Sequence, residues 1–153
     1  MALKKDSKLD LKITYDDLLN NSKYLWDVSN KDLISQNIQK VHKKHVTQII
    51  KLQNKQNQII SIGEDGFLKV CDLISKQVIK SFKICDLNLS SFVALKEDEI
   101  YAIGCWDNKL YIFNLNYGSK IKVISAHNES ISSIIYLNNS NILLTASWDC
   151  TVK

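Results

Sequence analysis

The chain has 153 residues, 45% of them hydrophobic and 24% charged, a composition typical of a folded domain and not of a disordered chain. The formal net charge is +4, and all 20 basic residues are lysines. Because arginine supplies the planar fork that reads guanine and clamps phosphate, a dedicated nucleic-acid reader without a single arginine is not expected.

The N-terminus lacks the apolar segment of a signal peptide, and the apolar runs of about four residues are too short to span a membrane. The cysteines, at 71, 85, 105 and 150, form no C-x-x-C pair. We therefore expect reduced thiols, with no disulfide and no bound metal. These features predict a soluble, cytoplasmic protein without a cofactor.

Residues 1–40 form the least regular part of the sequence. The segment Leu11–Leu19 is loosely amphipathic and predicts a helical turn or a linker. The segment Asn20–Asp27 resembles the third strand and closing Trp-Asp of a repeat, and Asp32–Ile38 resembles the strand after it. The alternative is a linker that lends one edge strand to a sheet.

From residue 41 onward, short apolar or alternating segments are separated by polar turns, which is the pattern of β-strands. Two complete sets of four strands are followed by a set of two, and none of these repeats has a long segment of helical periodicity. The predicted strands are Val46–Leu52, Gln58–Ile62, Phe67–Leu73, Val78–Phe82, Ser90–Leu95, Ile100–Ile103, Leu110–Leu115, Lys122–Ser125, Ile131–Tyr136 and Ile142–Ala146.

The strand sets repeat in sequence as well as in pattern. Three similar segments, Ser61–Leu73, Ile103–Leu115 and Thr145–Lys153, each have an aspartate at the fifth position, and these aspartates (65, 107 and 149) are spaced 42 residues apart. A histidine precedes the first aspartate by 23 residues (His42) and the third by 22 (His127). A period of about 40–45 residues is typical of four-stranded propeller blades.

The combined pattern, H-x3-V, S/T-x3-D and then D-x-x-h-x-h-aromatic-D/N, resembles the WD-repeat (WD40) family over residues 41–153. The stretches Leu89–Ser91, Gly104–Phe113 and Ala146–Lys153 are most similar to the WD-repeat region of BEACH-domain proteins, particularly the factor associated with neutral sphingomyelinase activation. The resemblance implies an all-β, partial β-propeller with four-stranded antiparallel blades and a truncated last blade. The expected divisions are 1–40, an N-terminal linker or the end of a preceding blade, 41–83 and 84–125, two repeats, and 126–153, a truncated repeat.

The resemblance also implies a function. It indicates a protein-interaction scaffold in a BEACH-type trafficking or signalling adaptor, not an enzyme, with other proteins as partners and the remaining blades supplied by a longer chain or by self-association. The alternative is a peripheral membrane or phosphoinositide-binding propeller, which the basic patch Lys40–His45 would serve.

In this family a loop histidine, a strand hydroxyl, the turn aspartate and a strand-three Trp form a buried hydrogen-bonded network. The middle copy has Cys85, Ile103 and Phe113 in three of these positions, so its network is expected to be lost and packing to hold the blade together. In the first copy Cys71 takes the Trp position. The residues assigned to the network are His42, Ser61, Asp65, Asp107, His127, Thr145 and Asp149.

The family geometry places the partner face at the turn before each motif aspartate and around the start of each first strand. Two positions, Trp106 and Trp148, are the strongest candidates, because a Trp in a turn buries a large area on binding at little rotamer cost. Packing of each Trp on a neighbouring loop is the alternative. The predicted face comprises Glu64, Trp106, Trp148, His45, Asn88, Ser130, Thr47, Ser90 and Ser132.

Two groups look like chemical sites. The third-copy set of His127, Thr145 and Asp149 resembles a catalytic triad, but a nucleophile needs an open site and an oxyanion hole, so a structural role is favoured. The spacing of His42 and His45 suits a metal, but no third ligand lies nearby in the sequence.

Overall fold

The computed structural model describes residues 24–26, 33–35, 40–55, 57–96 and 99–153, which belong to two compact units, 1–39 and 40–153. In the first unit, β1 (Tyr24–Trp26) pairs antiparallel with β2 (Leu33–Ser35). Both strands fall within the two segments that resemble the end of a repeat. The helical turn suggested for Leu11–Leu19 lies outside the described residues.

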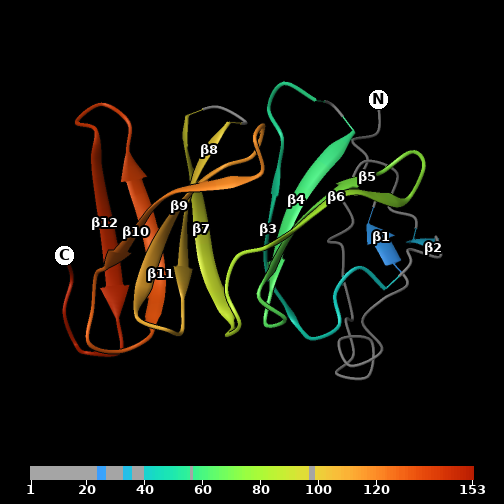
Figure 1. Ribbon diagram of the computed structural model, residues 1–153. Coiled ribbons are helices and arrows are strands. Elements are labelled where there is room, and N and C mark those ends of the chain that lie inside the picture. Colours follow the sequence, from blue (N-terminus) through green and yellow to red (C-terminus); the bar gives the residue numbers. More distant parts are fainter. Residues whose placement is uncertain (1–23, 27–32, 36–39, 56, 97–98) are drawn as a thin grey trace, which may run out of the picture. The chain divides into compact units, whose positions relative to one another are not determined.

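The second unit consists of three antiparallel sheets, called here the first, second and third blades (Figure 1). In each blade, strands adjacent in the sequence are hydrogen-bonded neighbours. The first blade contains β3 (Val46–Lys51), β4 (Gln58–Gly63), β5 (Phe67–Asp72) and β6 (Gln77–Lys83). The second contains β7 (Leu89–Lys96), β8 (Ile100–Cys105), β9 (Lys109–Asn114) and β10 (Ser119–Ser125). The third contains β11 (Ile131–Leu137) and β12 (Ile142–Ser147).

The architecture confirms the predicted all-β, partial propeller. The ten strands expected from the alternating sequence are all present, and their ends agree with the prediction to within three residues. In the third blade, Thr145 and Lys153 exchange both backbone hydrogen bonds, at 2.9 and 3.0 Å, and Ala146 bridges to Val152. Val152 and Lys153 therefore pair antiparallel with β12.

Apolar side chains fill the spaces between successive blades. Between the first and second blades lies a cluster that includes Ile60, Leu68, Phe92 and Tyr101, all nearly inaccessible to solvent. A smaller cluster, centred on Ile131, fills the space between the second and third blades. Burial of such side chains is the main stabilising contribution available to stacked sheets.

The central strand of the second blade, β8, supplies both clusters because its side chains alternate between the two faces of the sheet. Tyr101 and Ile103 belong to the larger cluster, and Ala102 belongs to the smaller one. Gly104 faces the third blade, where a Cβ would lie 2.7 Å from Ile131 Cγ2. The third blade therefore approaches closely because small residues face it.

Polar contacts also join the blades. The Gln48 side chain donates to Phe92 O at 3.1 Å and accepts from Phe92 N at 2.8 Å, so one amide makes two bonds to the backbone of β7. The Thr47 hydroxyl donates to Leu89 O at 2.8 Å. These bonds fix the position of β7 along the length of β3 and thereby align the loops at the ends of both strands.

Candidate functional site

The three motif aspartates lie in the same turn of successive blades. One carboxylate oxygen of each accepts the backbone N–H two residues later, at 3.2 Å for Asp65 and Asp107 and 3.0 Å for Asp149. The residue between them has a positive φ in every case: 76° at Gly66, 68° at Asn108 and 64° at Cys150. The aspartate side chain thus accepts a backbone N–H group of the turn that contains the left-handed residue.

In the first blade the imidazole of His42 joins the aspartate to the neighbouring strand. Nδ1 lies 2.9 Å from Asp65 Oδ1, and Nε2 lies 2.8 Å from Ser61 Oγ. Because an ionised carboxylate only accepts, Nδ1 donates to it, which leaves Nε2 to pair with the serine hydroxyl. The other carboxylate oxygen accepts Lys43 N–H at 2.9 Å. His42, Ser61 and Asp65 are all buried, and each hydrogen-bonds to at least one other member of the set.

The third blade repeats the arrangement. His127 Nδ1 lies 2.9 Å from Asp149 Oδ2 and Nε2 lies 2.8 Å from Thr145 Oγ1. The same carboxylate oxygen accepts Asn128 N–H at 3.0 Å. The hydroxyl of Thr151 is the strongest influence that holds the pKa of Asp149 below its usual range; burial opposes it, and the bonds from Asn128 and His127 reinforce it.

For Asp65 the balance differs. Burial raises the pKa of this carboxyl. The hydrogen bonds from His42 and Lys43, together with the electrostatic attraction of the His42 ring, lower the pKa by more, so it lies below its ordinary value. Both carboxylates are therefore ionised acceptors at neutral pH. Breaking either network leaves a polar group with an unmet hydrogen bond, which destabilises the fold.

In the first and third blades, a lysine four residues after the motif aspartate makes a further hydrogen bond beside the network. The sequence analysis did not assign this lysine a role. Lys69 Nζ donates to Val41 O at 2.6 Å, and Lys153 Nζ donates to Ala126 O at 2.8 Å. Each carbonyl belongs to the residue just before the network histidine. Alignment on the aspartates puts both lysines in one column, and that is the signal that would have identified them.

The second blade departs from this plan. At the lysine position it has Tyr111, whose hydroxyl donates to Asp107 Oδ2 at 2.5 Å. Burial is the largest cause that raises the pKa of Tyr111, followed by this bond and the negative charge of the carboxylate. At the histidine position it has Cys85, whose sulfur contacts Cys105 Sγ at 2.6 Å. Among the described residues of the second blade, these polar contacts stand beside the apolar packing at the positions that the network occupies in the other two blades.

The networks are not open to a substrate. The side-chain hydroxyls of Ser61 and Thr145, which would be the nucleophiles of a triad, are engaged by imidazole and belong to residues only 3% and 5% exposed. The two histidines suggested as a metal pair bind different carboxylates, His42 that of Asp65 and His45 that of Glu64. A structural role for the network residues accounts for these contacts.

The predicted partner-face residues come together in pairs through a backbone bond that recurs in all three blades. The residue before the motif aspartate donates its N–H to the carbonyl of the residue before the first strand. This bond joins Glu64 to His45 at 2.9 Å, Trp106 to Asn88 at 3.0 Å and Trp148 to Ser130 at 3.0 Å. Because only backbone atoms take part, the side chains at these positions are free to point elsewhere.

Trp106 and Trp148 meet each other at this end of the second and third blades. Their ring centroids are 6.0 Å apart with an interplanar angle of 46°. Trp106 is 43% exposed and Trp148 is 67% exposed, although both are large apolar side chains. The Ser130 hydroxyl donates to Trp106 O at 3.3 Å, which ties the third-blade loop to the second-blade turn. We call the two indoles the tryptophan pair.

The three hydroxyl positions after the first-strand hydrophobes differ. Thr47 and Ser132 are exposed, and their hydroxyls donate to backbone carbonyls, Leu89 O for the first and Ala146 O, at 3.2 Å, for the second. The Ser90 hydroxyl is buried and has no hydrogen-bond partner among the described residues. In the present conformation Ser90 therefore offers no hydroxyl to a partner.

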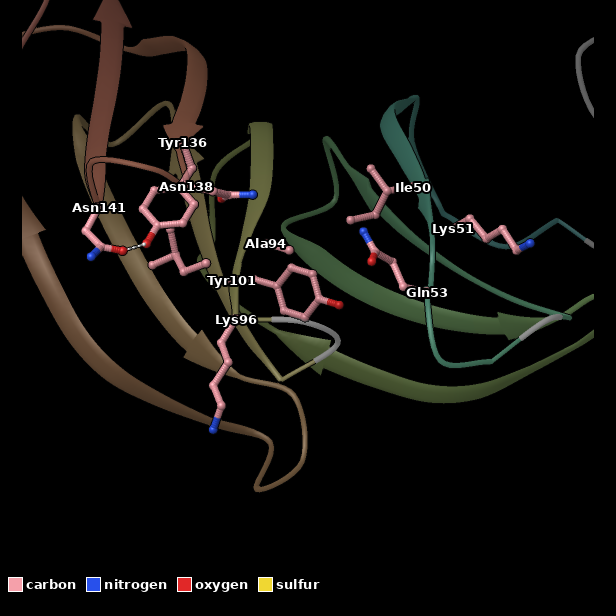
Figure 2. Close-up of a pocket in the computed structure, with 10 residues that line it drawn as sticks. Ile50, Lys51, Gln53, Ala94, Lys96, Tyr101, Tyr136, Asn138 and Asn141 are labelled. Atoms are coloured by element: carbon pink, nitrogen blue, oxygen red, sulfur yellow. Dashed lines mark hydrogen bonds between the residues drawn. The ribbon is translucent and has the colours of Figure 1, made fainter.

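A hollow of about 620 Å³ lies at the opposite ends of the first strands (Figure 2). Ile50, Ala94 and Tyr136 line it from β3, β7 and β11, and the Tyr136 hydroxyl donates to Asn141 Oδ1 at 2.9 Å. Lysines, amides, tyrosines and aliphatic side chains make up its lining, without a carboxylate, imidazole or thiol among the described residues.

The stacked blades, with the recurrent His–hydroxyl–Asp network, define a segment of a repeat-built β-propeller. Residues 118–153 match the model of the WD40 family, described as "WD domain, G-beta repeat". The matched segment is therefore identified as a WD40 repeat. Proteins with this fold generally act as interaction scaffolds.

Solved structures agree on the fold. The WD40 β-propeller domain of Doa1 superposes with a TM-score of 0.72 and 20% identity, covering 84% of this chain and 41% of that one. The computationally designed Ika8 protein gives a TM-score of 0.60 and 21% identity, covering 72% and 33%.

Curated relatives match in sequence. "Periodic tryptophan protein 2 homolog" of Dictyostelium discoideum is 27% identical over 104 residues, 65% of this chain and 11% of the relative. "Myosin heavy chain kinase C" of the same organism is 25% identical over 95 residues (62% and 12%). "BEACH domain-containing protein B" of Arabidopsis thaliana is 29% identical over 107 residues (66% and 4%). The chain thus spans only a small part of these relatives. Among the described residues there is no helix long and apolar enough to cross a membrane.

Proposed function

We propose that this chain is a protein-docking segment whose partner binds over the tryptophan pair. The observation that carries the proposal is the joint exposure of Trp106 and Trp148 at the loop end of two adjacent blades, with their rings 6.0 Å apart. Tryptophan is enriched among the residues that dominate binding energies, because its large rigid surface is desolvated at little entropic cost. An exposed pair of such rings is the kind of anchor that protein partners use.

The charges around the pair favour a protein over a polyanion. The loops at this end of the blades carry acidic groups, including Asp86 and Glu129, beside basic groups such as Lys43 and Lys109. Nucleic acids and anionic membranes select surfaces of one positive sign. A mixed rim around an aromatic centre is instead typical of protein interfaces.

The finer assignment is a BEACH-type trafficking or signalling adaptor, located in the cytoplasm or at the periphery of membranes. It is supported by the 29% identity to a BEACH domain-containing protein and by the resemblance of residues 104–113 and 146–153 to that group. The blades of this chain would then contribute one part of a larger docking surface.

The docking proposal is tested by selecting a phage-displayed peptide library on the immobilised chain and measuring the affinity of the selected peptides. Trp106→Ala is expected to raise Kd by about 30-fold or more, which corresponds to at least about 2 kcal/mol. The matched control is Tyr117→Ala, because Tyr117 is also an exposed aromatic (83%) but lies in the β9–β10 turn. Urea unfolding of each variant checks that the fold is kept.

Two results decide the question. Affinity that falls for Trp106→Ala and Trp148→Ala but not for Tyr117→Ala supports docking at the pair. Equal affinities for all three stable variants would place the peptide site elsewhere and overturn the proposal.

A second candidate function is binding to anionic lipid through residues 40–45. It is favoured by the exposure of Lys40, Lys43 and Lys44, although Glu64 accepts a hydrogen bond from His45 within the same patch. Co-sedimentation with phosphatidylserine-containing vesicles at low salt, lost in Lys43→Gln/Lys44→Gln, would support this function. Absence of binding at low salt removes it.

A further inference from the structure

Two cysteine sulfurs lie in direct contact at the loop end of the second blade. Cys85 follows β6 in the connection to β7, and Cys105 is the last residue of β8. Their Sγ atoms are 2.6 Å apart, although both cysteines are free thiols. A disulfide has an S–S distance of about 2.05 Å, so the two sulfurs need to approach by only about 0.6 Å to be joined.

Comparison with the first blade indicates that the two cysteines occupy one shared space. The position of Cys85 there belongs to His42, and the position of Cys105 belongs to Gly63. A Cβ on Gly63 would lie 2.8 Å from His42 Nδ1, so the imidazole leaves room only for glycine. In the second blade both positions change together, and two thiols fill the volume of one imidazole.

The two thiols are not equivalent. Cys85 is partly exposed, whereas Cys105 is completely buried. The hydrogen bond from Cys105 is the main cause that lowers the pKa of Cys85, while the same bond and burial raise the pKa of Cys105. Cys85 is therefore the thiolate-forming, accessible partner, and Cys105 is held behind it as a resolving thiol.

We propose that Cys85 and Cys105 form a reversible dithiol–disulfide pair that is oxidised by a small disulfide such as glutathione disulfide. The Cys85 thiolate attacks one sulfur of glutathione disulfide, forming a mixed disulfide and releasing one glutathione thiolate. Cys105 gives up its proton to solvent and attacks Cys85 Sγ, releasing the second glutathione thiolate, and both thiolates take up a proton. Overall, two protein thiols lose two electrons and two protons, and glutathione disulfide becomes two molecules of glutathione.

The bond would fasten the β6–β7 connection to the strand end that presents Trp106. Cys105 directly precedes Trp106, and Asn88 of the same connection accepts the Trp106 N–H at 3.0 Å. The Cys85 thiol also donates to Leu87 O at 3.0 Å. Formation of the disulfide does not depend on the proposed docking function; only an effect on partner binding would.

The test is to incubate the 153-residue chain with glutathione disulfide, block free thiols and digest with trypsin. Cleavage after Lys83, Lys96 and Lys109 puts Cys85 in peptide 84–96 and Cys105 in peptide 97–109, while Cys71 and Cys150 fall in two other peptides. A covalent 84–96/97–109 pair that dithiothreitol separates is the expected product. The same reaction in urea should lose the preference for this pair.

Variants separate a resolving thiol from a bystander. In Cys105→Ser, Cys85 should remain as the glutathione mixed disulfide, whereas the exposed-cysteine control Cys150→Ser should form the linked peptides as the parent does. Amide exchange at Trp106 should be slower in the oxidised chain. The proposal is overturned if the folded parent chain accumulates only mixed disulfides or links Cys150 instead, and the fastening role is overturned if the link forms without slowing that exchange.

Discussion

Gly66 is the position at which the turn after the motif aspartate tolerates a side chain least, and Gly66→Ala should destabilise the second unit severely. Its φ of 76° costs an alanine about 1–2 kcal/mol. The new Cβ would also lie 2.1 Å from Cys85 O, so that this carbonyl must move by about 0.9 Å merely to reach a 3.0 Å separation.

That movement disturbs the connection between the first two blades. Ile84 donates its N–H to Gly66 O at 2.9 Å, and its side chain is completely buried in the larger apolar cluster. Loss of this bond and partial loss of packing add about 1–3 kcal/mol. We therefore expect a decrease of about 2–5 kcal/mol in the free energy of unfolding, or a chain that does not fold.

The assay is urea unfolding followed by circular dichroism, with Cys150→Gly as the control. Cys150 occupies the same place in the third blade with a φ of 64° and an exposed side chain. Glycine there relieves the backbone, so the free energy of unfolding should stay the same or rise by about 1 kcal/mol. A loss below about 1 kcal/mol for Gly66→Ala would refute the reasoning, because neither the φ nor the contact would then constrain the turn.

Three further changes test the networks. His127→Ala leaves the buried Thr145 hydroxyl and the part-buried Asp149 carboxylate without their bonds to the imidazole, and should lower the free energy of unfolding in urea by about 2–4 kcal/mol; an unchanged midpoint would contradict the structural role. Tyr111→Phe removes only the bond to Asp107, so urea unfolding should show a loss of about 1 kcal/mol, and a loss as large as that of His127→Ala would indicate a packing role instead. Because the folded pKa of Asp65 is lowered, its contribution is complete above the ordinary value of 3.8 and is lost as the pH falls through the folded pKa. In urea unfolding measured at a series of pH values, the difference in the free energy of unfolding between the parent chain and Asp65→Asn should therefore shrink below pH 3.8. A constant difference would argue against a stabilising role for the ionised Asp65 carboxylate.

Much of the architecture follows from local sequence patterns. The alternation of apolar residues located the strands, since a half-buried strand exposes every second side chain. The 42-residue spacing of the aspartates grouped the strands into blades, and the spacing from histidine to aspartate brought His42 and His127 to the correct turns. These features can be found in the sequence because they depend on short stretches of chain and on the regular spacing with which those stretches recur.

What the sequence did not reveal depends on neighbouring space. Cys85 and Cys105 look unrelated in the chain, and they meet because one imidazole is missing between them. Tyr111 looks like an ordinary strand aromatic, yet its hydroxyl reaches Asp107. The 6.0 Å separation of the tryptophan pair is set by the packing of one sheet on the next, which no pattern within a single repeat specifies.

The recurrent backbone bond at the loop end of each blade holds the residue before the motif aspartate in the same way in all three blades, whatever its side chain. Since the hydrogen bond uses only main-chain atoms, Glu64 and Trp148 are held in the same way, although one side chain is acidic and the other is aromatic. Mutation at such a position alters what the surface offers while leaving the support beneath it intact. A change of side chain at Glu64, Trp106 or Trp148 is therefore expected to leave this backbone bond in place.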